Sequence, residues 1–196
     1  MRKTPDEALV PGALEKYSHD LTTLAQQGRF RPLQRREKEV GRVFQVLARS
    51  LKNNPMLIGE DNAERFAIVA EVIRRISSGD VPEDLKIQRV VALDLEVLVA
   101  DTLERGDFDK LLKSVFAEIK QAVGQILLFI DNFHVVVGAG RTENAIDMAN
   151  ILVPALSRHE VCILGTSTLD DYRKYVERDA ALQRRFQEIV IREFNE

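Results

Sequence analysis

Two short stretches of the sequence place charged and polar side chains directly after an apolar run. The first is the turn at residues 59–66 (GEDNAERF), and the second is the pair Asp131 and Asn132. A turn of the pattern G-x-x-x-x-G-K-[ST] between a strand and a helix cradles phosphates through its backbone N–H groups. An acidic pair at the end of a strand can hold Mg²⁺ and activate a water. We therefore test both stretches for phosphate chemistry.

The turn keeps one element of this pattern and loses three. Gly59 supplies the first glycine, but Glu64, Arg65 and Phe66 stand where the second glycine, the lysine and the Ser/Thr hydroxyl belong. Glu64 adds a carboxylate near Asp61, and two like charges about 4 Å apart cost about 4 kcal/mol at an effective dielectric near 20. The guanidinium fork of Arg65 is not a compact ammonium, and Phe66 cannot ligate Mg²⁺. We expect no bound nucleotide and no metal.

The acidic pair is also incomplete. Asn132 follows Asp131, and its amide has no basic oxygen at neutral pH with which to activate a water. Asp131 alone is interpreted as a carboxylate at the end of a strand. The sequence therefore predicts that no residue serves as the catalytic base for hydrolysis.

The remaining candidates for metal or thiol chemistry are isolated. His19, His134 and His159 lack the spacing of metal ligands, and Cys162 lies in an apolar run with no histidine beside it. We interpret Cys162 as a buried small hydrophobe.

Predicted strands and helices alternate along the chain, and this arrangement would place both stretches at the ends of strands. Helical patterns separate the apolar runs, with stripes such as Val40, Val43, Phe44 and Leu47 in a helix over 36–51. This alternation predicts an α/β fold with a mainly parallel sheet covered on both faces, and ligands outside the carboxyl ends of the strands. The predicted strands are 55–59, 90–95, 126–131, 162–166 and 188–194.

Composition narrows the class of protein. The chain has 196 residues, a formal net charge of −3, one cysteine and no long basic block. We expect no binding to nucleic acid and no membrane span, and a reducing, cytoplasmic location suits the single thiol. Residues 1–13 are interpreted as a tail or linker, and residues 14–28 as a helix that ends at Gly28.

Several long segments, taken together and in this order, resemble the first AAA+ domain of the Clp/ClpB/ClpC chaperone ATPases. The resemblance implies a three-layer P-loop NTPase/AAA+ fold with a five-stranded, mainly parallel sheet flanked by helices. It also implies that residues 14–196 are the AAA+ large subdomain and that the small helical lid is absent. The matching segments are LEKYSHDLTTLAQQG (14–28), KNNPMLIGE (52–60), SGDVPEDLK (78–86), ILLFIDNFHVVVGAG (126–140) and ILGTSTLDDYRKYVERDAALQRRF (163–186).

The same resemblance assigns further roles around the nucleotide. It implies that Asn132 stands where the family has a glutamate that polarises the attacking water. Thr168 matches a polar sensor at the end of a strand, and Arg184 and Arg185 match paired arginines that reach the γ-phosphate site of a neighbouring subunit. Surface charges on an amphipathic helix remain the other reading of the two arginines. The adenine-lining step Ile-Gly-Arg of relatives reads Gln34-Arg35-Arg36 here.

Two loops match the substrate-gripping loops of the family's central pore. Glu104, Arg105 and Gly106 match the first loop, but Glu104 replaces its aromatic residue. Residues 138–141 match the second loop, with a surface turn as the other reading.

Three functional hypotheses follow from these matches. In the first, the chain is a hydrolysis-deficient structural or regulatory ring module of a protein-unfolding or disaggregating machine, with other AAA+ subunits as partners and protein substrates for the assembly. In the second, it is a divergent but active ATPase that uses ATP, ADP and Mg²⁺ through Arg65, Asp131 and Thr168. In the third, the altered pocket holds an uncharged ligand or a peptide segment.

Overall fold

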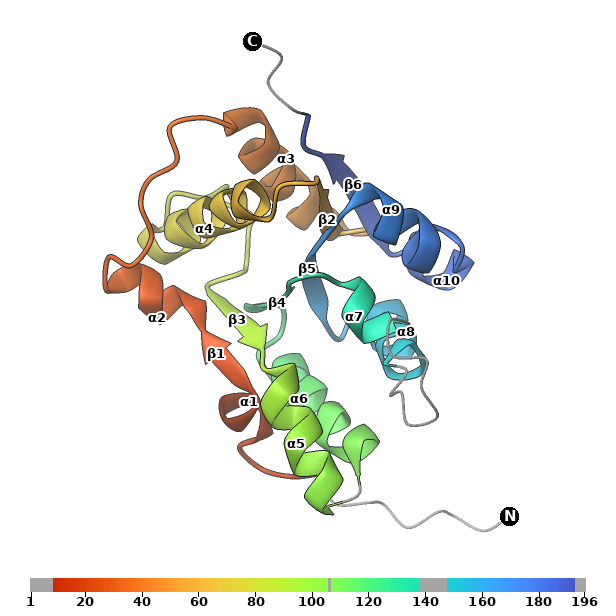
Figure 1. Cartoon of the computed structure of the whole chain (residues 1–196). Coiled ribbons are helices and arrows are strands. Elements are labelled where there is room, and N and C mark those ends of the chain that lie inside the picture. The colour runs from red at the N-terminus through yellow and green to blue at the C-terminus, as the bar shows by residue number, and fades with distance from the viewer. Residues whose placement is uncertain (1–8, 106, 138–147, 193–196) are drawn as a thin grey trace.

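A six-stranded, mainly parallel sheet forms the centre of the molecule (Figure 1). The structure is a computed structural model, and it describes residues 9–105, 107–137 and 148–192. The strand order is β1-β3-β4-β5-β2-β6, and only β1 pairs in the antiparallel sense. The strands are β1 Ser18–Asp20, β2 Asn54–Ile58, β3 Arg89–Leu93, β4 Ile126–Ile130, β5 Cys162–Ser167 and β6 Phe186–Val190.

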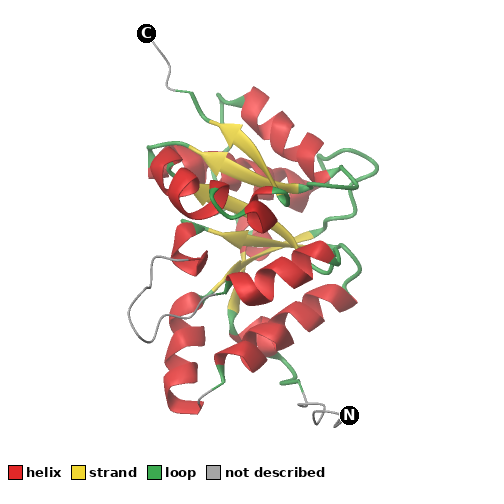
Figure 2. Cartoon of the chain, turned by 90° about the vertical axis from the view of Figure 1, so that its right-hand side faces the viewer, coloured by secondary structure: helices red, strands yellow, loops and turns green. Residues whose placement is uncertain are grey.

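Helices cover both faces of this sheet, which gives three layers (Figure 2). Alternate residues of each strand point to opposite faces, so Leu57 packs in one core cluster while its neighbours Met56 and Ile58 pack in the other. The helices of the first face are α2 Leu21–Gln26, α3 Glu37–Leu47 and α4 Asn62–Ser78. The second face carries α1 Ala13–Lys16, α5 Leu95–Arg105, α6 Phe108–Gln121, α7 His134–Val137, α8 Ala149–Ser157, α9 Leu169–Asp171, the π-helix η1 Tyr172–Glu177 and α10 Ala180–Gln183.

The three-layer α/β architecture predicted from the sequence is confirmed, with six strands in place of five. Residues 14–28, predicted as one helix, contain α1, the short strand β1 and α2. The strand predicted over 90–95 ends at Leu93, and α5 begins at Leu95. The last strand begins at Phe186 and ends at Val190, earlier than the predicted 188–194.

The strand order positions the carboxyl ends of β2, β4 and β5 beside one another. The chain leaves β2, passes through α4 and enters β3 on the far side of β4 and β5, so the direction of winding changes next to β2. Open α/β sheets bind ligands outside the carboxyl ends of the strands at such a point. Gly59 begins the turn there, and a Cβ atom on it would lie 3.2 Å from Cβ of Ile191, so a larger residue fits poorly.

Among the described residues, the longest helices are too short or too polar to cross a lipid bilayer.

Candidate functional site

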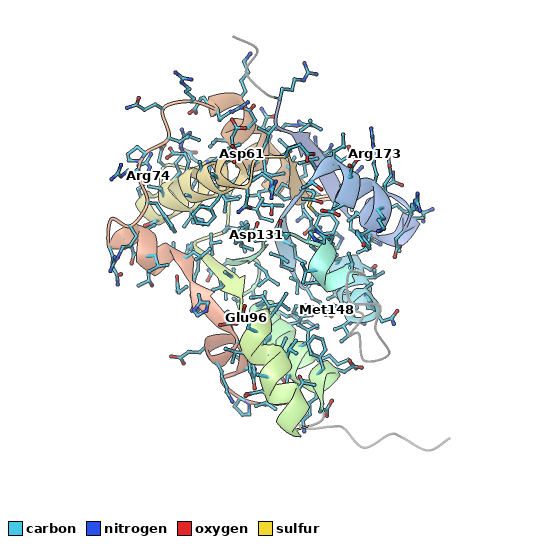
Figure 3. The ribbon with its side chains drawn as sticks, viewed as in Figure 1. Asp61, Arg74, Glu96, Asp131, Met148 and Arg173 are labelled. Atoms are coloured by element: carbon cyan, nitrogen blue, oxygen red, sulfur yellow. The ribbon has the colours of Figure 1, made fainter. Side chains whose placement is uncertain are left out.

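The turn after β2 caps its own helix. Asp61 precedes α4, and its Oδ1 accepts hydrogen bonds from the backbone N–H groups of Ala63 at 2.8 Å and Glu64 at 3.2 Å. Free N–H groups at the first turn of a helix are what binds a phosphate at such a place. The carboxylate of Asp61 accepts from two of them, so these two N–H groups are engaged within the chain (Figure 3 labels Asp61).

Arg65 points back into the turn and across to β4. Only 3% of the residue is exposed. Its Nη1 donates to the carbonyl oxygens of Gly59 and Glu60, the latter at 3.2 Å, while Nη2 donates to Oδ1 of Asn62 at 3.0 Å and to Oδ1 of Asn132 at 3.2 Å. The guanidinium therefore joins the turn after β2 to the turn after β4.

Glu64 is paired inside the chain. Its carboxylate accepts a hydrogen bond from Nη2 of Arg36, whose Nη1 donates to Glu39 at 3.1 Å and to the carbonyl oxygen of Arg192 at 2.6 Å. Burial by itself lowers the pKa of Arg36, but the hydrogen bonds to Glu64 and Glu39 outweigh it and raise that pKa. The sequence predicts no partner for the charge of Glu64, but in the structure an arginine 28 residues away compensates it.

Phe66 lies on the outer side of α4. Its side chain is partly exposed and meets Phe30 edge to face, with ring centroids 6.1 Å apart. Phe66, which the sequence analysis matches to a Mg²⁺-binding hydroxyl, thus contacts the segment between α2 and α3.

Asp131 and Asn132 form a closed set of hydrogen bonds with Thr166 of β5. The hydroxyl of Thr166 donates to Oδ1 of Asp131 at 2.5 Å, and the same hydroxyl accepts from the backbone N–H of Asn132 at 2.9 Å. Nδ2 of Asn132 donates to Oδ2 of Asp131 at 3.3 Å. Asn132 has a φ of 48°, a left-handed conformation that asparagine adopts more readily than most residues.

Thr168 caps a short helix instead of facing the turn after β2. Its hydroxyl accepts from the N–H of Asp171 at 3.2 Å and donates to Oδ2 of that residue at 2.8 Å. The same oxygen lies 3.4 Å from Nδ1 of His134, whose ring stacks on Tyr175. Glu60 joins this region to the turn, because its Oε1 accepts from the N–H of Leu169 at 3.2 Å.

Arg184 and Arg185 lie at the other end of β2. Arg184 ends α10, and the carbonyl oxygen of Arg185 accepts from Nδ2 of Asn54, the first residue of β2, at 2.9 Å. Gly59 follows the other end of that strand, about 16 Å away at 3.3 Å per residue. The two arginines are therefore separated by the length of a strand from the turn in their own chain.

The remaining sequence-predicted residues do not join the site. Glu104 and Arg105 are the last residues of α5, and Gly106 and residues 138–141 lie outside the described part of the chain. The thiol of Cys162 donates to the carbonyl oxygen of Asn53, and burial raises its pKa to about 12. No group of three metal-ligating side chains occurs in residues 9–105, 107–137 and 148–192.

Three contacts of this site were not predicted from the sequence. The Arg36–Glu64 and Thr166–Asp131 pairs link residues that are 28 and 35 positions apart, so no local pattern indicates them. The capping role of Asp61 did have a signal, since aspartate one residue before a helix, with glutamate three residues later, is typical of a helix start.

The geometry does not fit a triphosphate with Mg²⁺. The N–H groups of Ala63 and Glu64 donate to Asp61, the guanidinium of Arg65 donates to four oxygens of the chain, and Phe66 offers no oxygen to a metal. The residues that cradle phosphate in an intact turn are here engaged with one another.

Comparison with known protein families gives one match over most of the chain. The family described as the SMAX1 nucleotide binding domain matches residues 29–187. Among curated proteins, chaperone protein ClpB 2 of Thermosynechococcus vestitus is 52% identical over 180 residues, which cover 91% of this chain and 20% of that protein. Chaperone protein ClpB of Corynebacterium diphtheriae is 50% identical over 182 residues, which cover 92% of this chain and 21% of that protein. The chain thus spans about a fifth of these relatives.

Solved structures agree with this match. A closed-state cryo-EM reconstruction of Hsp104 with ATPγS and FITC casein has a TM-score of 0.80 and 42% identity, covering 92% of this chain and 31% of that one. The Hsp104–ADP complex of S. cerevisiae also has a TM-score of 0.80 and 42% identity, over 93% of this chain and 25% of the other.

Proposed function

The chain belongs to the Clp/ClpB family as an N-terminal AAA+ chaperone domain, and from this premise we propose that it is a module that does not hydrolyse ATP. Its own side chains take the contacts that a nucleotide would need. The domain then contributes to the chaperone as a packing unit of a ring and not as a motor.

The contact between Arg65 and Asn132 carries this proposal. A lysine at the first position binds phosphate as a mobile point charge, and a glutamate at the second activates water. Here a buried guanidinium bonds to the asparagine at 3.2 Å and to three oxygens of the turn. An incoming triphosphate would have to break these bonds, and a hydrogen bond to a charged group contributes about 1.5–3 kcal/mol.

The assembly role rests on the arginines at the opposite edge. Arg184 is exposed, Arg185 is half-buried, and neither side chain has a hydrogen bond or ion pair within the described ranges. Because they lie a strand's length from the turn of their own chain, they suit a role on an adjacent AAA+ subunit. We propose other AAA+ subunits as the partners and unfolded protein as the substrate of the assembly.

Thermal unfolding with and without Mg²⁺-ATP tests the proposal. A ligand at 1,000 times its Kd stabilises a protein by about 4 kcal/mol, so even a micromolar site shifts the midpoint at millimolar ATP. We expect no shift for the chain itself and a clear shift for the back-substituted variant Glu64→Gly, Arg65→Lys, Phe66→Thr, Asn132→Glu. Chromatography of the supernatant from denatured protein should show no ADP.

The opposite outcome favours the active ATPase. Stabilisation of the unaltered chain by Mg²⁺-ATP, together with steady phosphate release that Asp131→Ala abolishes, would overturn the proposal. Asp131 suits this control because its carboxylate is exposed at the end of β4.

A further inference from the structure

Helix α5 is held at its middle by the segment that precedes β1. The carboxylate of Asp101 contacts two residues through the same oxygen: Nζ of Lys16 lies 2.5 Å from Oδ2, and the hydroxyl of Tyr17 donates to it at 2.7 Å. Burial, followed by this contact with Asp101, raises the pKa of Tyr17, so the phenol remains a donor at neutral pH. Asp101 thus fixes one face of the helix to residues 16 and 17.

The beginning of α5 is held by the same segment. Asp94 caps the helix, because its Oδ1 accepts from the N–H of Val97 at 3.1 Å. The backbone N–H of Asp94 donates to the carbonyl oxygen of Tyr17 at 2.8 Å, and Oδ2 lies 2.7 Å from Nε2 of His19. Asp94 and Asp101 are seven positions apart, which is two helical turns and the same side of the helix.

Apolar packing holds α5 less firmly than it holds the other long helices. Leu98 is the one fully buried side chain between residues 95 and 102, while Val97 and Val99 are each 37% exposed. On α6, by contrast, seven residues of the same core face are buried. Between residues 95 and 102, only Leu98 and the partly buried Leu95 pack against the core, so the polar contacts carry a large share of the restraint on this helix.

The holding segment is itself fixed to the body of the domain. Strand β1 pairs with β3, the N–H of Val10 donates to Oγ of Ser114 at 2.9 Å, and the N–H of Ala13 donates to Glu118 at 2.8 Å. In Figure 1, α1 and β1 lie beside α6 and β3. Residues 16–19 therefore connect α5 to the rest of the domain, and a displacement of these residues would move α5 through their contacts with Asp94 and Asp101.

We infer that Lys16, Tyr17 and His19 form a clamp that positions α5 through its two carboxylates, Asp94 and Asp101. The helix ends at Arg105, so the clamp sets the position of the backbone at Glu104 and Arg105. Only the consequence for substrate, which follows from the match of these two residues to a substrate-gripping loop, rests on the proposed function. The position of α5 itself does not.

Hydrogen exchange of the intact chain tests the clamp. Asp101→Ala removes the contacts of the carboxylate with Lys16 and Tyr17, while alanine raises the helix propensity of α5. If the clamp positions α5, its amides should exchange about tenfold faster, although the substitution favours the helix locally. Amides of β4 should keep their protection. The paired variant Lys16→Met, Tyr17→Phe should have the same effect from the other side of the contact.

A distance measurement supplies the readout of position. Spin labels at Ala100→Cys on α5 and Lys38→Cys on α3, both exposed, in a Cys162→Ala background should give one narrow distribution that Asp101→Ala shifts or broadens. Glu96→Ala is the matched control, since it removes an exposed carboxylate from the same helix and should leave both readouts unchanged. The inference is overturned if Asp101→Ala leaves α5 exchange and distance unaltered, or if β4 loses protection together with α5. Neither readout involves nucleotide, so failure here leaves the proposed function standing.

Discussion

Nη2 of Arg65 lies 3.2 Å from Oδ1 of Asn132, and this hydrogen bond joins the first turn of α4 to the end of β4. The two residues are 67 positions apart in the sequence, and in the proposed function they replace a phosphate-binding lysine and a water-activating glutamate. The two side chains are complementary, since a guanidinium donates and an amide oxygen accepts. The site therefore holds together without a ligand.

We expect Arg65→Met to lower the free energy of unfolding by about 2–3 kcal/mol, because the carbonyl groups of Gly59 and Glu60 lose their buried donor. Asn132→Ala should lower the free energy of unfolding by about 1 kcal/mol. The double variant should lose about 1 kcal/mol less than the sum of the two single losses, because both single substitutions remove the same hydrogen bond. Urea unfolding of the four proteins measures this coupling. Strict additivity would mean that the contact contributes nothing, and Arg178→Met on the surface should stay within about 0.5 kcal/mol of the unaltered chain.

A second network makes stability depend on pH. Glu71 is 1% exposed and accepts from Arg74, Arg75 and the N–H of Leu33. The bond from Arg74 is the largest cause that lowers its pKa from 4.5 to about 2. Because the folded pKa is depressed, the stabilisation is fully present above pH 4.5 and is lost as the pH falls toward 2. It amounts to about 3 kcal/mol at 1.36 kcal/mol per pH unit.

Glu71→Gln should therefore destabilise the chain by about 2–3 kcal/mol at pH 7, and the difference should narrow between pH 4.5 and pH 2. Urea unfolding at pH 7, 4.5 and 3 measures it. Glu37→Gln is the control, because Glu37 shares Arg75 but is exposed, and it should cost less than about 1 kcal/mol. A difference that stays constant with pH would show that the loss comes from packing and not from charge.

The sequence predicts the parts of the fold that repeat a period over many residues. The buried runs that became β2, β4 and β5 and the amphipathic stripe of α3 were all recognised, because one face of each is apolar throughout. Strand β1 was not recognised, since Leu14, Tyr17, Leu21 and Leu24 recur at helical spacing and its three residues pair only with the distant β3.

The candidate site was predictable by position but not by contact. Residues 59–66 and 131–132 do lie at neighbouring strand ends, as the parallel alternation implies. From the sequence alone, the charge of Glu64 is expected to repel a phosphate. In the structure the segment between α2 and α3 lies against α4, and this brings Arg36 to the carboxylate of Glu64. Such a pair follows from tertiary structure and leaves no local pattern.

The single thiol should react slowly in the native state. Cys162 is half-buried, its thiol donates to the carbonyl oxygen of Asn53, and burial raises its pKa to about 12, so little of the reactive thiolate is present at pH 8. We expect a disulfide reagent to label the native chain by less than about 10% in the time that fully labels Ser50→Cys, an exposed control. In urea both proteins should react at equal rates. Fast native labelling of the unaltered chain would place the thiol at the surface.

Replacing the paired arginines should change assembly without changing the fold. Arg184 is exposed and Arg185 is half-buried, and the contact of Arg185 with Asn54 uses its backbone oxygen, which an alanine retains. The variant Arg184→Ala, Arg185→Ala should thus unfold within about 0.5 kcal/mol of the unaltered chain. In a longer chain that contains residues 1–196, its sedimentation should shift toward smaller species, because each subunit loses two cations at the contact with its neighbour.

The control variant Arg173→Ala, Lys174→Ala removes the same charge from the exposed side of η1 and should leave sedimentation unchanged. Equal shifts for both variants would show that net charge, and not these two arginines, governs assembly. Unchanged sedimentation of both variants would show that Arg184 and Arg185 do not take part in the interface.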